Sequence, residues 1–83
     1  MVTLNDTIQV LRDVLHLGVR ADAFTAATPL LGSVPEFDSM AVVSVLAGIE
    51  ERFGVIVDDD EISADLFETI GTLHAFVLTK LAA

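Results

Sequence analysis

The sequence predicts a small all-α protein: a helical bundle with three main helices, one short helix and a long first loop. Three stretches carry apolar residues at alternating steps of three and four, the spacing of one face of an amphipathic helix. These positions are Leu4, Ile8, Leu11 and Leu15; Val42, Leu46, Ile49 and Phe53; and Ile70, Leu73, Val77 and Leu81. Because the chain has 83 residues and no internal repeat, we expect a single domain over residues 1–83.

The first two main helices have recognisable ends. Thr3 can cap a helix over about residues 3–17, which Gly18 can end. Asp38 can cap a second helix over residues 39–53, with Gly54 as the residue after its end. The β-branched residues between 42 and 49 also allow a strand there. The length of the stretch and its charged ending favour the helix.

Residues 19–38 show no clean period and are rich in Thr, Pro, Gly and Ser, so we expect a loop. A loop of this length in a small domain is unusual and points to function. Leu30, Leu31 and Phe37 are expected to pin it to the core.

The remaining elements follow the second helix. Residues 55–62 read as a loop, because the apolar triplet at their start has no partner strand. A short helix is expected over about residues 63–67, and Thr69 can cap a last helix over residues 69–82.

Composition limits the function classes. Thirteen acidic residues against four basic ones give a formal charge of −9, which argues against direct binding to nucleic acid or anionic membrane. This charge keeps an apolar chain soluble and would also steer a basic protein partner. No apolar stretch is long enough to cross a membrane, and the first residues have no basic signal region. We therefore expect a cytoplasmic protein without membrane insertion.

Two groups of titratable residues are expected to carry no chemistry. The sequence pairs neither His16 nor His74 with a carboxylate or nucleophile, so both are interpreted as ordinary helix residues. The acidic run at residues 58–61 fails the calcium-loop template, since Ser63 occupies the sixth position, where a glycine is needed. We interpret the run as a solvated loop and predict no metal site, although weak divalent binding stays open.

Ser39 is the candidate functional residue. Behind the Asp38 cap it occupies the first position of a helix, where backbone N–H groups are unpaired and the macrodipole is positive. A phosphate ester on its hydroxyl would lie where a helix best accommodates an anion. Helix capping alone also explains serine and aspartate at this place.

The chain resembles the acyl carrier proteins over about residues 4–82. Asp38-Ser39-Met40 is similar to that family's Asp-Ser-Leu attachment motif, and residues 46–63 resemble the end of its second helix with the acidic loop. Residues 28–33 resemble the loop before the serine, and residues 67–77 the start of the last helix. The long first loop is then a family feature.

The resemblance implies a carrier rather than an enzyme. Ser39 would bear phosphopantetheine, transferred from coenzyme A by a phosphopantetheinyl transferase, and the thiol of this arm would hold acyl groups as thioesters. Asp38 would cap the helix and assist the transferase's metal-bound complex. The acyl chain would lie in a cleft lined by neighbouring apolar residues, namely Met40, Val43, Leu46, Phe53, Leu66 and Leu73.

One departure from the family pattern concerns partner docking. Typical fatty-acid carriers have acids in the first turns of the second helix, where this chain reads Met40-Ala41-Val42-Val43-Ser44-Val45. The expected docking residues are therefore largely apolar: Met40, Ala41, Val42 and Val45, with Glu50 and Glu51 at the far end. This favours a specialised pathway over housekeeping fatty-acid synthesis. Residues 28–33, 38–43 and 57–64 resemble bacterial carriers linked to exosortase and exopolysaccharide gene clusters. That resemblance implies loading by an AMP-forming acyl ligase, and acyltransferase or synthase enzymes are the other expected partners.

Other interpretations remain. A peptidyl carrier domain is disfavoured because its serine usually follows a Gly-Gly pair, and Phe37-Asp38 precedes Ser39 here. An acidic helical adaptor without a prosthetic group and a weak calcium sensor are the alternatives from other classes. A monomer is expected, because internal faces account for most apolar residues, although Ala41, Val42 and Val45 leave room for self-association.

Overall fold

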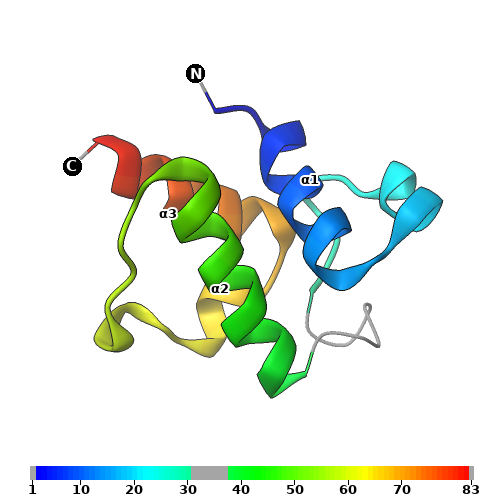
Figure 1. Cartoon of the computed structure of the whole chain (residues 1–83). Helices are drawn as coiled ribbons and strands as arrows, with labels where there is room; N and C mark the ends of the chain where they lie inside the picture. Colours follow the sequence, from blue (N-terminus) through cyan, green and yellow to red (C-terminus); the bar gives the residue numbers. More distant parts are fainter. Residues whose placement is uncertain (1, 31–37, 83) are drawn as a thin grey trace.

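The computed structural model describes residues 2–30 and 38–82, and of Ser39, Asp59 and Ala64 it describes the backbone alone. These residues form three α-helices: α1 (Leu4–Leu15), α2 (Ser39–Phe53) and α3 (Ile70–Ala82). Three 3₁₀ helices lie in the connections: η1 (Gly18–Ala23), η2 (Asp59–Glu61) and η3 (Ala64–Phe67). Both α2 and α3 pack against α1 (Figure 1). The described residues hold no strand beyond a single bridge between Pro29 and Thr69, and the predicted all-α bundle is confirmed.

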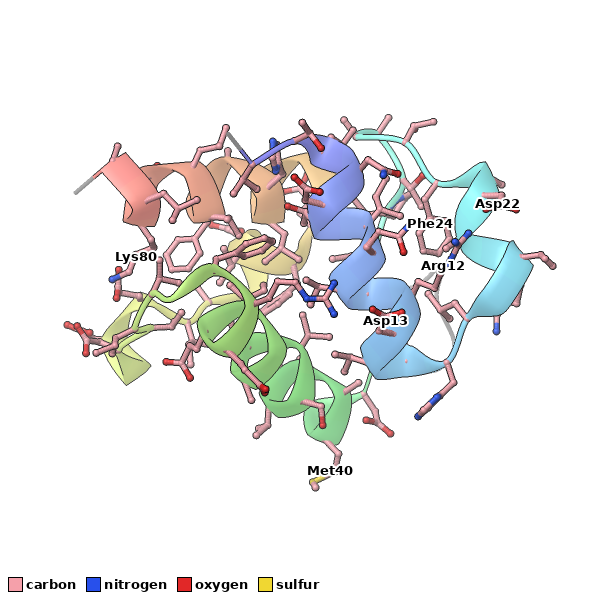
Figure 2. All side chains as sticks on the ribbon, turned by 45° about the horizontal axis from the view of Figure 1, so that its top comes forward. Arg12, Asp13, Asp22, Phe24, Met40 and Lys80 are labelled. Atoms are coloured by element: carbon pink, nitrogen blue, oxygen red, sulfur yellow. The ribbon has the colours of Figure 1, made fainter. Side chains whose placement is uncertain are left out.

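The observed helix bounds follow the predicted ones except at the end of α1. The second helix has the predicted bounds, and α3 and η3 each begin one residue later than expected. The first helix ends at Leu15 rather than residue 17, where His16 takes a left-handed conformation (φ 56°). The chain then turns into η1, which the sequence predicted as loop, and an ion pair between Arg12 and Asp22 holds η1 against α1 (Figure 2).

The predicted caps are present. The hydroxyl of Thr3 accepts a hydrogen bond from the N–H of Asp6 (3.3 Å), whose carboxylate accepts one from the N–H of Thr3 (2.9 Å). The hydroxyl of Thr69 accepts from the N–H of Thr72 (3.1 Å) at the start of α3. Gly54 ends α2 with a φ of 69°, a conformation in which glycine avoids the strain of a side chain.

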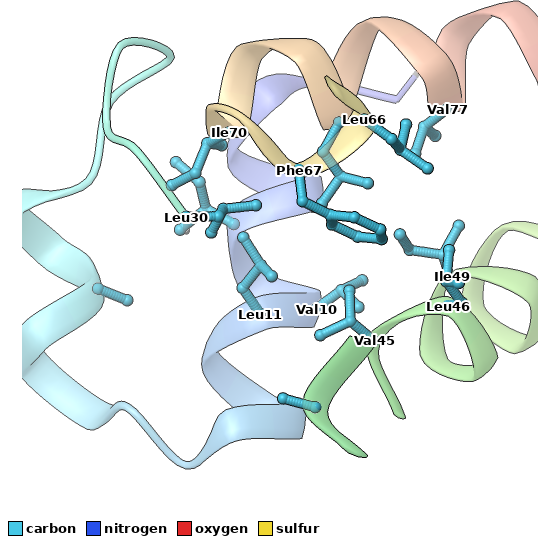
Figure 3. Packing of buried hydrophobic residues seen from close by; sticks show 14 of the residues in the cluster. Val10, Leu11, Leu30, Val45, Leu46, Ile49, Leu66, Phe67, Ile70 and Val77 are labelled. Carbon is cyan, nitrogen blue, oxygen red and sulfur yellow. The ribbon is translucent and has the colours of Figure 1, made fainter. Parts of the chain in front are cut away.

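The core lies where the three helices meet (Figure 3). Most residues of the predicted inward faces are buried there, and Leu30 pins the first loop to it as expected. Leu31 and Phe37 lie outside the described residues. Leu81 was predicted to face the core, but this prediction is wrong, since 40% of its surface is exposed. It lies in the last turn of α3 and lines an open depression rather than the core.

Hydrogen bonds tie the first loop to the start of α3. The N–H of Leu30 donates to the carbonyl of Glu68 (3.2 Å), and the N–H of Ile70 donates to the carbonyl of Thr28 (2.9 Å). The N–H of Gly71 donates to the carbonyl of Ala26 (2.8 Å). These bonds give backbone groups at the start of α3 partners that the helix itself lacks. They also hold residues 26–30 of the first loop against the start of α3.

We expect Gly71→Ala to destabilise the protein, although alanine is the better helix former. A Cβ atom at residue 71 would lie 2.8 Å from the carbonyl oxygen of Ala26, so backbone must move. The strain should outweigh a propensity gain of about 1 kcal/mol, with a net loss of about 1–3 kcal/mol in the free energy of unfolding. Urea denaturation followed by circular dichroism measures this change. A Gly71→Ala protein more stable than the unaltered one would contradict the close approach of residue 71 to the carbonyl of Ala26.

Within the described parts of the chain, none of the helices combines the length and the hydropathy that a membrane crossing requires.

Candidate functional site

The candidate site is the start of α2, where Asp38 and Ser39 lie side by side in the chain. Asp38 has extended backbone (φ −107°, ψ −171°), and its carboxylate accepts a hydrogen bond from the N–H of Ala41 (2.9 Å). Its carbonyl accepts from the N–H of Val42 (3.0 Å), the first bond of the helix. The predicted cap is thus confirmed, and Ser39 is the first helical residue.

This position suits an attached phosphate. The N–H groups of a first helical turn and the helix dipole favour an anion there. The two neighbours of Ser39, Asp38 and Met40, are exposed, and the Met40 side chain points away from the helix (Figure 2). A modifying enzyme can therefore reach this segment from solvent. The Ser39 side chain lies outside the described atoms, and its site role rests on the backbone position.

The expected docking face of α2 needs correction. Ala41 (7% exposed) and Val45 (0%) point into the core, and Val42 is half-buried. Position 45 lies one turn from Ile49, on the side of the helix that is buried in the core. Among the side chains of the helix that the structure describes, the exposed ones are instead Met40, Val43, Ser44, Ala47, Glu51 and Arg52. The same burial leaves Ala41 and Val45 unavailable for self-association.

Two of the three charges that end α2 are engaged within the molecule. The carboxylate of Glu50 accepts a hydrogen bond from the N–H of Val57 (2.8 Å), which holds the following segment against the helix. The guanidinium of Arg52 pairs with Asp13 of α1 (2.9 Å). Of the two acids expected to dock partners, Glu51 is exposed and Glu50 is half-buried.

Most side chains of the expected acyl cleft pack in the core or against it. Leu46, Leu66 and Leu73 are buried members of the core, and Phe53 is half-buried against it. Val43 is 62% exposed, and together with Leu46 it lines the surface depression described below rather than an interior cleft. Met40, also placed near the cleft, is 73% exposed. In the described residues, Leu66, Leu73 and Phe53 therefore pack in the core or against it, whereas Val43 and Leu46 border the depression.

A surface depression lies beside the exposed face of α2. Its volume is about 210 Å³, and it lies between α2 and the segment at residues 57–62. Its lining is mostly apolar: Val43, Leu46, Ala47, Glu50, Val57 and Ile62. The hydrogen bond between Glu50 and Val57 joins its two walls. Sequence periodicity gave no indication of this feature, because the opposite wall comes from a segment without a regular period.

An ion pair anchors the acidic segment to α3. The ammonium of Lys80 donates to the carboxylate of Glu61 (2.8 Å), which also accepts from the N–H of Asp58 (3.0 Å). These hydrogen bonds, that from Lys80 first, lower the pKa of Glu61 below its ordinary value of 4.5. The hydrogen bond to Glu61 likewise raises the pKa of Lys80 above 10.5. Among the described residues no group of three metal-ligating side chains comes together.

We expect this ion pair to make stability depend on pH at both extremes. Because the folded pKa of Glu61 is lowered, its contribution is present above about pH 4.5 and is lost as pH falls through the folded value. Because the folded pKa of Lys80 is raised, the stability that this group contributes is present below about pH 10.5 and is lost as pH rises through the folded value. As pH is lowered from 7 to 3, the thermal midpoint should fall less in Glu61→Gln than in the unaltered protein, because glutamine has no carboxylate to protonate. An equal fall of the thermal midpoint in the two proteins would contradict a contribution of the ion pair to stability.

One polar contact between helices was missed by sequence reasoning. The hydroxyl of Thr7 in α1 lies 2.8 Å from Nδ1 of His74 in α3, and Thr7 is fully buried. His74 is thus a packing residue that satisfies a buried hydroxyl, in keeping with its interpretation as an ordinary helix residue. The two positions are far apart in the sequence, so no local pattern could have joined them.

Comparison with known proteins gives one informative match. No protein-family model matches the chain, and neither does any curated protein. Among solved structures, the solution NMR structure of a holo acyl carrier protein from Nitrosomonas europaea matches with a TM-score of 0.91. The two sequences are 52% identical, and the match covers 100% of each chain.

The described residues thus form a three-helix bundle in which a helix capped by Asp38 begins at a serine. At this identity and coverage, the chain belongs to the acyl carrier protein family. Members of this family carry acyl groups between enzymes and interact with modifying and acyl-handling enzymes in general.

Proposed function

We propose that this protein carries acyl groups as thioesters on a phosphopantetheine arm attached to Ser39. The observation that carries the proposal is the place of Ser39, the first residue of α2 behind the Asp38 cap, in a fold that matches a holo carrier. When attached, the arm supplies the thiol that a chain without cysteine lacks. Asp38 holds the first turn in place through Ala41 and stays exposed to the transferase.

The proposed arm comes from coenzyme A and is installed by a phosphopantetheinyl transferase. We propose a single carrier domain over residues 1–83, acting as a monomer in the cytoplasm, where coenzyme A is supplied. We propose that nucleic acid is not a partner, because the formal charge of −9 repels phosphates. An acyl chain would find shelter only if the core side chains Leu46, Leu66 and Leu73 part around it, with half-buried Phe53 at their edge.

A specialised pathway remains our proposal for the carrier's role. The exposed face of α2 offers Met40, Val43 and Ala47, with Glu51 beyond them, rather than a row of acids. Such a face suits loading enzymes other than those of housekeeping fatty-acid synthesis, and an AMP-forming acyl ligase or an acyltransferase is the proposed loader. The sequence resemblance of residues 28–33, 38–43 and 57–64 to exosortase-linked carriers also supports this proposal.

The experiment that tests the carrier function is loading with an acyl group. The protein is incubated with a phosphopantetheinyl transferase and radiolabelled acetyl-coenzyme A, and is then treated with neutral hydroxylamine, which cleaves thioesters. We expect one label per chain, released by hydroxylamine. A transferase that labels another carrier but leaves this protein unlabelled, or a label that resists hydroxylamine, would contradict the proposal.

A further inference from the structure

We propose that the ring of Phe67 keeps long acyl chains out of the core, so that this carrier takes short acyl groups and leaves their thioester at the surface. The inference rests on the proposed function and names the class of its cargo. Phe67 is the last residue of η3 and follows Leu66, one of the residues expected to line the acyl cleft.

Phe67 occupies space that a sheltered acyl chain would need. It is 2% exposed and belongs to the same buried cluster as Leu46, Leu66 and Leu73, the three leucines of the expected cleft. Figure 3 shows its ring extending from η3 into the core toward Ile49 of α2. Because protein interiors have few voids larger than a water molecule, an acyl chain could lie among these leucines only if the ring moved out.

The backbone on both sides of Phe67 is anchored, which holds the ring in place. The carbonyl of Leu66 accepts a hydrogen bond from the hydroxyl of Thr72 in α3 (3.1 Å). The carbonyl of Glu68 accepts one from the N–H of Leu30 in the first loop (3.2 Å), and Leu30 is itself fully buried. Withdrawing the ring would therefore disturb bonds that join η3 to α3 and to the first loop.

The apolar surface left for the cargo is small. Positions 39, 43 and 46 are four and three residues apart, so Ser39 lies on the same side of α2 as the depression that Val43 and Leu46 line. Its volume of about 210 Å³ is below the range of about 300–1,000 Å³ that is usual for small-molecule sites. Each methylene group left in water costs free energy, so a carrier with a filled core suits short acyl groups.

The test loads the protein with acetyl or octanoyl groups, using a promiscuous phosphopantetheinyl transferase and acetyl- or octanoyl-coenzyme A. The readout, called the cleavage ratio below, is the rate at which neutral hydroxylamine cleaves the thioester, divided by the rate for the same acyl group on coenzyme A. A chain buried in the core draws its thioester away from solvent and lowers this ratio. We expect the acetyl and octanoyl cleavage ratios of the unaltered protein to agree within about twofold, because neither chain is buried.

The variants are Phe67→Leu and Phe67→Ala, with Phe24→Leu as the matched control. Phe24 is a half-buried phenylalanine at the end of η1, so this control makes the same change in another part of the fold. A cavity left by truncating an apolar core side chain stays dry and takes apolar guests. We expect the octanoyl cleavage ratio to fall about threefold or more below the acetyl ratio in Phe67→Leu, and further in Phe67→Ala. Octanoyl should also raise the thermal midpoint of these two variants above that of their acetyl forms, because only the folded state shelters the chain.

Phe67→Leu keeps most of the apolar volume and decides the test if circular dichroism shows that Phe67→Ala does not fold. An octanoyl cleavage ratio well below the acetyl ratio in the unaltered protein would overturn the proposal, because the core would then admit a long chain beside the ring. Equal ratios in folded Phe67→Leu, or the same fall in Phe24→Leu, would overturn the role of Phe67. In these outcomes the protein is loaded, so the carrier function stands. Failure of the unaltered protein to take either acyl group would overturn both proposals.

Discussion

Ser39→Ala is expected to abolish loading completely while leaving the fold intact. The proposed arm is joined through the serine hydroxyl, and alanine has no atom that can form the phosphoester bond. The cap of α2 is made by the Asp38 carboxylate and the N–H of Ala41, so it does not depend on the residue 39 side chain. An alanine in the first helical turn costs little stability. Incorporation of labelled acetyl-phosphopantetheine should fall to background.

Ser44→Ala is the matched control for this prediction. Ser44 is a second serine of α2, is exposed and lies just over one turn after Ser39. We expect its substitution to leave loading at the level of the unaltered protein. If Ser39→Ala kept its loading and Ser44→Ala lost it, the attachment site would be Ser44 rather than Ser39. Circular dichroism of both variants separates loss of the site from loss of the fold.

Leu73→Ala is expected to have the largest effect on stability. Leu73 lies in α3 and is fully buried in the core that joins the three helices. Truncating such a leucine costs about 2–5 kcal/mol, because apolar contacts are lost and a cavity remains. A domain of this length has a free energy of unfolding of about 4–12 kcal/mol. The variant should therefore lose a large share of its stability in urea denaturation, and with it the platform that presents Ser39.

Leu81→Ala makes the same chemical change in the same helix and should cost less than about 1 kcal/mol. The difference between the two leucines is burial, since 40% of the Leu81 surface is exposed. The sequence pattern places both on one inward face and predicts similar losses for them. Equal destabilisation by the two substitutions would contradict the packing of α3 described above.

The helix starts were predictable because their determinants are local. Thr3, Asp38 and Thr69 each accept a hydrogen bond from an N–H three residues later, and a polar residue before an apolar periodic run indicates such a cap. The place of Ser39 at the start of α2 followed from the same pattern. The family could be proposed because residues 46–63 combine a helix end and an acidic segment in a fixed order.

The exposed face of α2 was harder to predict, because apolar residues occur on every side of this helix. Val42 and Val45 are equally apolar, and only the packing of α2 into the core decides that Val45 is buried while Val42 is half-buried. The periodicity of three and four therefore indicated a helix without fixing its orientation. For this reason Ala41 and Val45 were expected on the docking face, although both are buried.

Contacts between distant residues also escaped prediction. Arg12 with Asp22 folds η1 against α1, Arg52 with Asp13 joins α2 to α1, and Thr7 with His74 joins α1 to α3. Each pair depends on how the helices cross, which a single sequence does not define. These contacts decide which charges remain available around the site.

The intact mass of the protein after incubation with coenzyme A and a promiscuous phosphopantetheinyl transferase tests the central claim most directly. Ser39→Ala is treated in parallel, and a second carrier shows that the transferase is active. We predict a gain of one phosphopantetheine by the unaltered protein and no gain by Ser39→Ala. An unchanged mass of the folded, unaltered protein, or an equal gain by both, would contradict the assignment of Ser39 as the attachment site.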